Sequence, residues 1–298
     1  MVLSSNSQNN QVITRFAPTP SGYLHLGHAY SAFFAERAAR SREGTLVLRI
    51  ENNDKTRCLE KYEKALVDDL TWLGLSWKNP VRRQSEYTQD YLKAVSKLKD
   101  MGLIYPCFCS RKDIWNKVNL ISNAPHNAVI GGLGPIYPGT CRSMTSDEQE
   151  NRILSGHQYA FRLDTMRAIR LVKSKQECFH WEDLDYGKQA AKPEIFGDFI
   201  IARKDGAASY HLSVVIDDAA QRVDLVTRGD DLRDVTHIHF LLQKLLELKS
   251  PRYQFHRLLL DSNGERYAKR NNAQSLRELR NQGITPAQII KNLGFSLL

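Results

Sequence analysis

The sequence predicts an α/β protein built on a doubly wound parallel sheet, and two observations support this fold class. An apolar run at residues 12–16 precedes an Ala-, Glu- and Arg-rich stretch at 29–40 that ends near Gly44, and a β-branched run follows at 45–51. This order predicts a strand–helix–strand unit with parallel strands. Further apolar runs at 196–203, 209–217 and 223–227 predict three strands of a second half of the sheet.

The segment between the first predicted strand and helix reads RFAPTPSGYLHLGH and spans residues 15–28. Its two prolines and Gly22 predict a rigid turn that leads into a helix N-terminus, where backbone N–H groups and the helix dipole favour a phosphate. His25 and His28 are three residues apart, so they would share one face of the first helical turn. Gly27 has no side chain and leaves room for a flat group such as a purine. The alternative is a loop with two surface histidines.

This segment closely resembles the ATP-binding HIGH signature of the class I aminoacyl-tRNA synthetases, in the form that the glutamyl/glutaminyl branch uses. The resemblance extends over residues 12–294. It implies a Rossmann-type fold with a mixed zinc-containing insertion and a short helical C-terminal part. It also implies ATP binding by His25, Gly27 and His28, and glutamate binding by the preceding residues Arg15, Phe16, Ala17, Pro18 and Thr19.

Glu51 lies at the carboxyl end of the second predicted strand, where ligands of doubly wound sheets bind. A carboxylate here can hold an ammonium group; the alternative is a solvated acid at a strand end. Residues 49–57, RIENNDKTR, are similar to a family pattern in which Asp usually stands at the place of Asn52, so only Glu51 is assigned a role. Helices are expected at 59–73 and 87–101, separated by a turn at Pro80.

Three cysteines and a tyrosine form the next pattern, Cys107-x-Cys109 followed by Tyr137-x-x-x-Cys141. Three thiols and a fourth ligand can close a tetrahedron around Zn²⁺, and the alternative is a set of buried or redox-active cysteines. The arrangement resembles the zinc site of glutamyl-queuosine tRNA(Asp) synthetases, in which tyrosine is the unusual ligand. With four protein ligands the zinc would be structural. Residues 116–135 between the two halves are expected to form a long loop.

The rest of the insertion is expected to be of mixed β character, with strands at 159–163, 168–172 and 177–183 and a short helix that opens at a capping box over residues 146–149. The second half of the fold then matches the family closely. In that family the positions of Tyr210 and Arg228 bind the amino-acid substrate. Glutamate carries two carboxylates and one ammonium group, and Arg15, Arg228 and Glu51 supply two cationic groups and one acid.

Residues 258–270, LLLDSNGERYAKR, stand where the class I KMSKS loop belongs. Lys269 matches its second lysine, which the family places on the ATP phosphates together with Mg²⁺. Arg266 and Ala268 replace the first lysine and the serine, and the alternative is a basic surface turn. A last helix is expected from Thr285, with Pro286 at its first position, to Gly294.

These matches divide the chain into five expected parts: a flexible tail at 1–11, the first half of the nucleotide-binding fold at 12–105, the insertion at 106–195, the second half at 196–260 and the KMSKS-like loop with C-terminal helices at 261–298. Full-length glutamyl- and glutaminyl-tRNA synthetases continue into an anticodon-binding domain, and no such domain is expected here. This difference favours the queuosine-modifying branch, whose substrates are glutamate, ATP and tRNA(Asp) carrying queuosine.

Composition agrees with a polyanionic partner, because the formal net charge is +9. Five cysteines without an export signal argue against a disulfide framework, and a monomeric cytoplasmic protein is expected. Two other functions stay open: a shortened glutamyl-tRNA synthetase that charges tRNA(Glu), and a non-catalytic relative that binds RNA or an amino acid.

Overall fold

The computed structural model describes residues 11–122, 130–131, 134–175, 179–260 and 274–296, which form two compact units. The first unit contains residues up to 83, 222–230 and those from 251 onward. The second contains residues 84–221 and 231–250. In the described part of the chain, no helix combines the length and the apolar composition that crossing a membrane requires.

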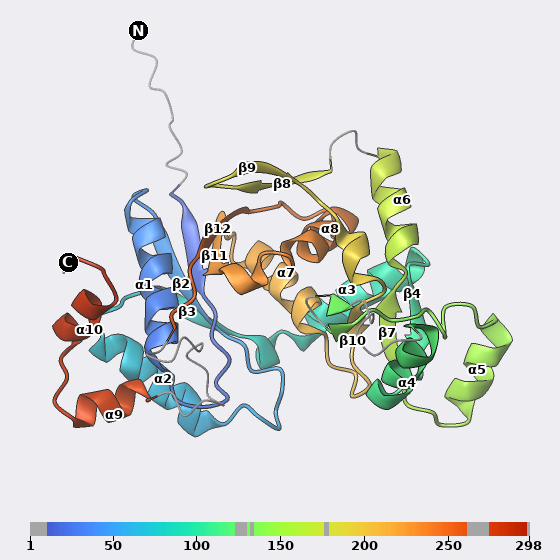
Figure 1. Cartoon of the computed structure of the whole chain (residues 1–298), viewed down its shortest axis with the longest axis horizontal. Coiled ribbons are helices and arrows are strands. Elements are labelled where there is room, and N and C mark those ends of the chain that lie inside the picture. The colour runs from blue at the N-terminus through green and yellow to red at the C-terminus, as the bar shows by residue number, and fades with distance from the viewer. Residues whose placement is uncertain (1–10, 123–129, 132–133, 176–178, 261–273, 297–298) are drawn as a thin grey trace, which may run out of the picture. The chain divides into compact units, whose positions relative to one another are not determined.

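Five parallel strands organise the first unit (Figure 1). They lie in the order β3–β2–β1–β11–β12, with β1 (Ile13–Phe16) at the centre, and the other bounds are β2 (Thr45–Ile50), β3 (Lys78–Arg83), β11 (Leu225–Gly229) and β12 (Arg252–His256). The strand order reverses at β1, so the carboxyl ends of β1 and β11 flank a topological switch point. Ligands of open α/β sheets bind at such points.

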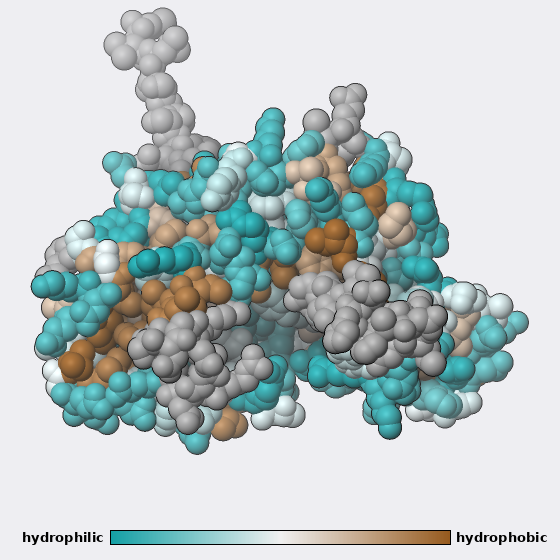
Figure 2. Space-filling view, viewed as in Figure 1, coloured by the Kyte–Doolittle hydropathy of each residue, from teal (hydrophilic) through white to brown (hydrophobic). Residues whose placement is uncertain are grey.

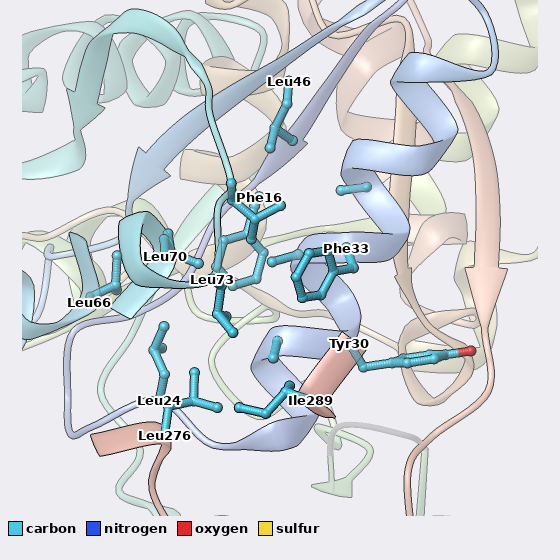
Figure 3. Packing of buried hydrophobic residues seen from close by; sticks show 14 of the residues in the cluster. Phe16, Leu24, Tyr30, Phe33, Leu46, Leu66, Leu70, Leu73, Leu276 and Ile289 are labelled. Atoms are coloured by element: carbon cyan, nitrogen blue, oxygen red, sulfur yellow. The ribbon is translucent and has the colours of Figure 1, made fainter. Parts of the chain in front are cut away.

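Helices α1 (Leu26–Arg40), α2 (Glu60–Trp72), α9 (Leu276–Asn281) and α10 (Pro286–Asn292) complete this unit. Their apolar faces meet in one core, where Phe16 of β1 and Phe33 of α1 point toward the leucines of α2 (Figure 3). Leu276 and Ile289 bring α9 and α10 into the same cluster. Hydrophobic residues also gather on the surface over α1 and α10, where the edge of this core reaches solvent (Figure 2).

The second unit is mostly helical and contains an antiparallel sheet in the order β10–β7–β4. Its helices are α3 (Thr88–Asp100), α4 (Arg111–Ser122), α5 (Ser146–Leu154), α6 (Thr165–Lys175), α7 (Tyr210–Ala220) and α8 (Thr236–Leu246). Its strands are β4 (Ile104–Cys107), β5 (Ile130–Gly131), β6 (Gly134–Pro135), β7 (Ala160–Leu163), β8 (His180–Asp183), β9 (Gly187–Ala190) and β10 (Ile200–Ala202). Short 3₁₀ turns occupy Gln84–Glu86, Pro193–Phe196 and Asp230–Leu232.

The predicted βαβ unit at residues 12–51, the strand at 223–227 and the last helix are confirmed. Three predictions in the second unit are wrong. Residues 209–217 and 168–172 lie in helices α7 and α6 rather than in strands, and residues 116–122 continue helix α4 rather than beginning a loop. A short apolar run is compatible with a buried helix as well as with a strand, which explains the first two errors. The run at 196–203 does contain a strand, β10, but that strand pairs antiparallel with β7 and does not join the parallel sheet as predicted.

Two smaller corrections concern element ends. Pro80 lies within the strand β3 instead of in a turn between two helices. Helix α5 begins one residue earlier than its predicted capping box implies, because Thr145 is the N-cap and Glu148 supplies the returning side chain.

Candidate active site

The predicted phosphate-binding loop joins β1 to α1 and is held from two sides. The Glu51 backbone N–H donates to the carbonyl of Pro18 at 3.1 Å, and the Leu276 N–H donates to the carbonyl of Leu24 at 2.7 Å. The first contact ties the loop to the end of β2, and the second ties it to the start of α9. The backbone of the loop is therefore fixed by the fold before any ligand binds.

The two histidines of this loop lie together at the start of α1. His25 is the N-cap with an extended backbone, and its ring centroid is 3.8 Å from that of His28. The backbone N–H of His25 donates to Nδ1 of His28 at 3.2 Å. Nδ1 of His28 is then an acceptor, so in the neutral ring the proton resides on Nε2, which can donate to a phosphate oxygen. Gly27 lies between them in the first turn.

The residues just before the loop divide into two groups. Phe16 turns its ring into the hydrophobic core, so its side chain is a packing group (Figure 3). Arg15 is buried and its Nη1 donates to the carbonyl of Thr227 in the adjacent strand β11 at 2.8 Å. This bond draws the guanidinium of Arg15 against the strand end that carries Arg228. Ala17, Pro18 and Thr19 belong to the irregular segment that follows β1.

Arg228 is also buried, near the carboxyl end of β11. Its guanidinium carbon lies 5.3 Å from the ring of Tyr253 and 5.7 Å from the ring of Phe255, both in β12. These aromatic faces stabilise the cation by their quadrupoles and restrict the rotamers of the long side chain. The two arginines thus belong to neighbouring strands at the switch point of the sheet.

Glu51 follows β2 directly, and its carboxylate is largely buried. Its Oε1 accepts from Nη2 of Arg49 at 3.3 Å, and Arg49 is fully buried. An adjacent guanidinium favours the charged form of a carboxylate. Arg49 was not recognised from the sequence as part of the site, although its position two residues before Glu51 in a strand places both side chains on one face.

Tyr210 belongs to the second unit, where it is the first residue of α7. Its side chain is 41% exposed, and its ring packs beside the rings of His211 and His239. Nδ1 of His211 and Nε2 of His239 are 3.2 Å apart. His237 takes a different partner, because its Nδ1 accepts from Nε1 of Trp181 at 3.0 Å.

Lys269, together with Arg266 and Ala268, lies outside the residues that the structure describes. The neighbouring backbone is described from residue 274 onward, and Ser275 forms an isolated bridge with His25. The polypeptide that follows the KMSKS-like segment is therefore adjacent to the start of the HIGH-like helix.

The predicted metal ligands of the second unit come together at the end of β4. The sulfur atoms of Cys107, Cys109 and Cys141 all lie within 4.8 Å of one another, and those of Cys109 and Cys141 are 3.6 Å apart. The hydroxyl of Tyr137 is 3.6 Å from the sulfur of Cys109. Two thiolates on a tetrahedral zinc are separated by about 3.8 Å when the Zn–S bonds have their usual length. The soft donors and their spacing fit zinc.

The thiols of this cluster differ in acidity. Burial raises the pKa of Cys109 to about 11. Burial also acts to raise the pKa of Cys141, but hydrogen bonds from the Tyr137 hydroxyl and the backbone N–H groups of Phe108 and Cys109 outweigh it and leave that pKa lowered. Burial raises the pKa of Tyr137 as well. A bound cation would favour the deprotonated form of every ligand.

Two further carboxylates of the second unit have structural roles. Asp198 is buried and accepts from the hydroxyl of Tyr105 at 2.6 Å and from the backbone of Thr165 at 3.0 Å. Asp217 accepts from Gln84 and Tyr91 at 2.8 and 2.9 Å. These buried carboxylates hold strands and helices of the second unit together.

Comparison with known proteins identifies the family of this chain. Residues 11–296 match the family model of the class I tRNA synthetases (E and Q), catalytic domain. The chain therefore belongs to the class I tRNA synthetases of the glutamate and glutamine branch. One relative that matches along its whole length is the glutamyl-Q tRNA(Asp) synthetase of Rhodobacter capsulatus, which is 41% identical over 95% of this chain and 100% of its own length. That of Nitratidesulfovibrio vulgaris is 38% identical, over 92% and 83%.

A glutamate–tRNA ligase of Hydrogenobaculum sp. is 34% identical over 95% of this chain, but the match spans only 57% of the ligase. Among solved structures, a glutamate tRNA ligase from Elizabethkingia meningosepticum is similar with a TM-score of 0.69 and 21% identity. That match covers 92% of this chain and 53% of the solved chain, so this chain spans about half of its length. The likeness shows that the fold is the α/β fold of class I synthetases.

Proposed function

We propose that this protein activates L-glutamate with ATP and transfers the glutamyl group to queuosine at the wobble position of tRNA(Asp). The observation that carries the proposal is the group of charged side chains at the carboxyl edge of the parallel sheet. Arg15 and Arg228 lie on adjacent strands, and Glu51 follows the next strand. The choice of tRNA(Asp) as the acceptor rests on the similarity to the two glutamyl-Q tRNA(Asp) synthetases named above.

This set matches the charges of glutamate. Two buried guanidinium groups can each take one carboxylate, and the carboxylate of Glu51 can take the ammonium group. Charge-assisted bonds of this kind are strong when the groups are shielded from water. Tyr210, at the exposed start of α7, is proposed as a further contact to the amino acid. The segment at Ala17, Pro18 and Thr19 is proposed to offer backbone groups to the same substrate.

ATP is proposed to bind along the start of α1. The start of α1 offers the positive end of the helix dipole, and Nε2 of His28 can donate a hydrogen bond to a phosphate oxygen. Gly27 leaves the backbone accessible to the purine. Lys269 is proposed to bind the phosphates from the KMSKS-like segment, together with Mg²⁺, which neutralises phosphate charge in reactions of this type.

The first step needs positioning and charge stabilisation rather than a base. The α-carboxylate of glutamate is already ionised at neutral pH, and its oxygen attacks the α-phosphorus of ATP. A new P–O bond forms, the bond to the bridging oxygen breaks, and pyrophosphate leaves with the electron pair. His25, His28 and the helix N-terminus stabilise the charge on the phosphates. A hydroxyl of queuosine then attacks the glutamyl carbonyl, and AMP leaves.

The thiol cluster is proposed to hold a structural zinc through Cys107, Cys109, Cys141 and Tyr137. Four protein ligands leave no open position for a reacting molecule. Such a site would stabilise the insertion at residues 106–195 and take no part in the chemistry. We also propose the five-part division of the chain given above, a monomeric state and a cytoplasmic location.

Glutamate-dependent exchange between ATP and pyrophosphate, with and without tRNA, tests the function. Members of the queuosine-modifying branch activate glutamate unaided, whereas glutamyl-tRNA synthetases need their tRNA. We expect exchange without tRNA, followed by glutamyl transfer to queuosine-containing tRNA(Asp) and no transfer to the same tRNA lacking queuosine. Exchange that appears only with tRNA(Glu) would identify a charging enzyme. The absence of exchange under every condition would favour a non-catalytic binding protein.

A further inference from the structure

A buried arginine contacts the thiol cluster. Arg162 belongs to β7, and its Nε donates to the sulfur of Cys107 at 3.3 Å. Its guanidinium carbon lies 4.1 Å from the centre of the Tyr137 ring. Its Nη1 donates to the backbone carbonyl of Asp198 at 2.8 Å. One planar group therefore touches two of the four candidate zinc ligands and is anchored to the backbone by a third contact.

The sheet explains how Arg162 reaches this place. In the antiparallel pair of β4 and β7, Tyr105 lies opposite Arg162 and Cys107 lies opposite Ala160. Side chains two residues apart on a strand share a face, so Cys107 and Arg162 are diagonal neighbours on the same face of the sheet. A long side chain spans such a diagonal. The contact thus follows from strand register.

The energetics of the arginine point to the cluster as its partner. Arg162 is only 9% exposed, and a buried cation is costly unless an anion or several acceptors compensate it. The ion pairs found within the described residues do not join Arg162 to a carboxylate; its contacts are a sulfur, a ring face and a carbonyl oxygen. Three thiolates and a tyrosine around a divalent cation carry net negative charge, which a guanidinium compensates.

We propose that Arg162 is a positioning residue of the zinc centre. It supplies the counter-charge to the anionic ligand set and fixes the orientation of Cys107 and Tyr137. This role explains how a tyrosine can complete a set of three thiolates, because the guanidinium of Arg162 lies over the ring of Tyr137 and beside the sulfur of Cys107. The inference depends on metal binding by the cluster and is independent of the proposed reaction with glutamate.

Zinc affinity of the full-length chain tests the proposal, measured by competition with a chromogenic chelator. Arg162→Met removes the charge with little change in length, and Arg162→Lys keeps the charge without the planar group. Arg152→Met is the matched control, since Arg152 lies on the nearby helix α5 against Phe108, 5.5 Å from that ring, and touches no ligand. We expect a loss of about 10- to 100-fold for Arg162→Met, a smaller loss for Arg162→Lys and an unchanged affinity for Arg152→Met.

Cobalt(II) substitution separates a role at the metal from a general loss of structure. The visible spectrum of bound cobalt reports ligand geometry, and we expect Arg162→Met and Arg162→Lys to change it while Arg152→Met does not. Zinc affinity within about threefold of the wild type and an unaltered cobalt spectrum for Arg162→Met would overturn the proposal. If circular dichroism shows that Arg162→Met does not fold, a double-mutant cycle of Arg162→Lys and Tyr137→Phe, measured by zinc affinity, tests the proposal instead. Coupled losses of zinc affinity support the role, and additive losses refute it.

Discussion

The glutamate region of the first unit and the thiol cluster of the second are organised by different means. In the first, Arg15 is bonded to the backbone of β11, Arg228 is stacked on β12 and Glu51 is paired with Arg49. Each charged group has a partner within the fold and is positioned before a ligand arrives. In the second, the four candidate ligands mainly face one another at contact distance.

The two sites are therefore ordered by different interactions. A parallel sheet fixes side chains at its carboxyl edge through backbone pairing, so the ligand adds little to the stability of the frame. A cluster of thiols in mutual contact gains its order when a cation replaces that contact with coordination bonds. Changes in the first region should therefore affect activity first, and changes in the second should affect stability first.

Replacing Glu51 with Gln should have the largest effect. The amide cannot compensate the ammonium group of glutamate, and we expect kcat/KM for glutamate in the exchange reaction to fall by about 150-fold, or about 3 kcal/mol. Glu60→Gln is the matched control, because Glu60 is an exposed acid that pairs with Lys64 on the same helix. A loss of less than threefold for Glu51→Gln would show that this carboxylate does not bind the substrate.

Removal of zinc should act on stability instead. When free zinc is held at 100 times its dissociation constant, chelation should lower the free energy of unfolding by about 2.7 kcal/mol, which a shift of the thermal midpoint reports. Cys109→Ser should show a lower midpoint that no longer responds to the chelator. An identical midpoint for the wild type with and without chelator would mean that the cluster is not a metal site.

Gly44→Ala should destabilise the frame of the first unit. A Cβ at this position would lie 2.1 Å from the carbonyl oxygen of Val12 and 3.0 Å from that of Ala39, so the turn between α1 and β2 must shift. We expect a loss of about 2 kcal/mol in urea unfolding. Gly74→Ala provides the comparison: Gly74 has φ of +80° and an added Cβ would meet no atom within 4 Å. Gly74→Ala should lower the free energy of unfolding by only about 1 kcal/mol. Equal losses for the two variants would argue against close backbone packing at Gly44.

Asp69 should give the smallest effect, and one that depends on pH. Burial in α2 raises the pKa of Asp69 to about 6, with Asp68 acting in the same direction and Arg277 and Arg280 opposing it. The folded state then binds the proton more tightly than the unfolded chain, so this group's contribution to stability falls as pH rises from about 4 to 6. Asp69 also lines a surface pocket with Arg277 and Arg280, so solvent weakens the effect of its burial. The free energy of unfolding of Asp69→Asn should match that of the wild type near pH 4 and exceed it by about 1 kcal/mol at pH 7.5. Parallel stability profiles for the two proteins would contradict this.

Prediction from sequence succeeded where the signal is local. The apolar runs at residues 12–16 and 45–51 and the Ala-rich stretch between them are complete within a few residues, and they define the βαβ unit. The HIGH-like segment is likewise continuous, and the cysteine pattern consists of two short parts, Cys107-x-Cys109 and Tyr137-x-x-x-Cys141. The physical reason is that turn chemistry, capping and hydrophobic period act between neighbours in the chain.

Tertiary structure decided the rest. Residues 210–220 are rich in β-branched side chains but form α7, because Ser209 caps the helix and both Leu212 and Val215 are buried. Arg49 beside Glu51 and Arg162 beside Cys107 could not be assigned from composition, since strand register sets those contacts. The sequence by itself determined which reactive groups this protein carries. Only the fold decided which charges stand beside them, because burial and cross-strand distance are properties of the packed chain.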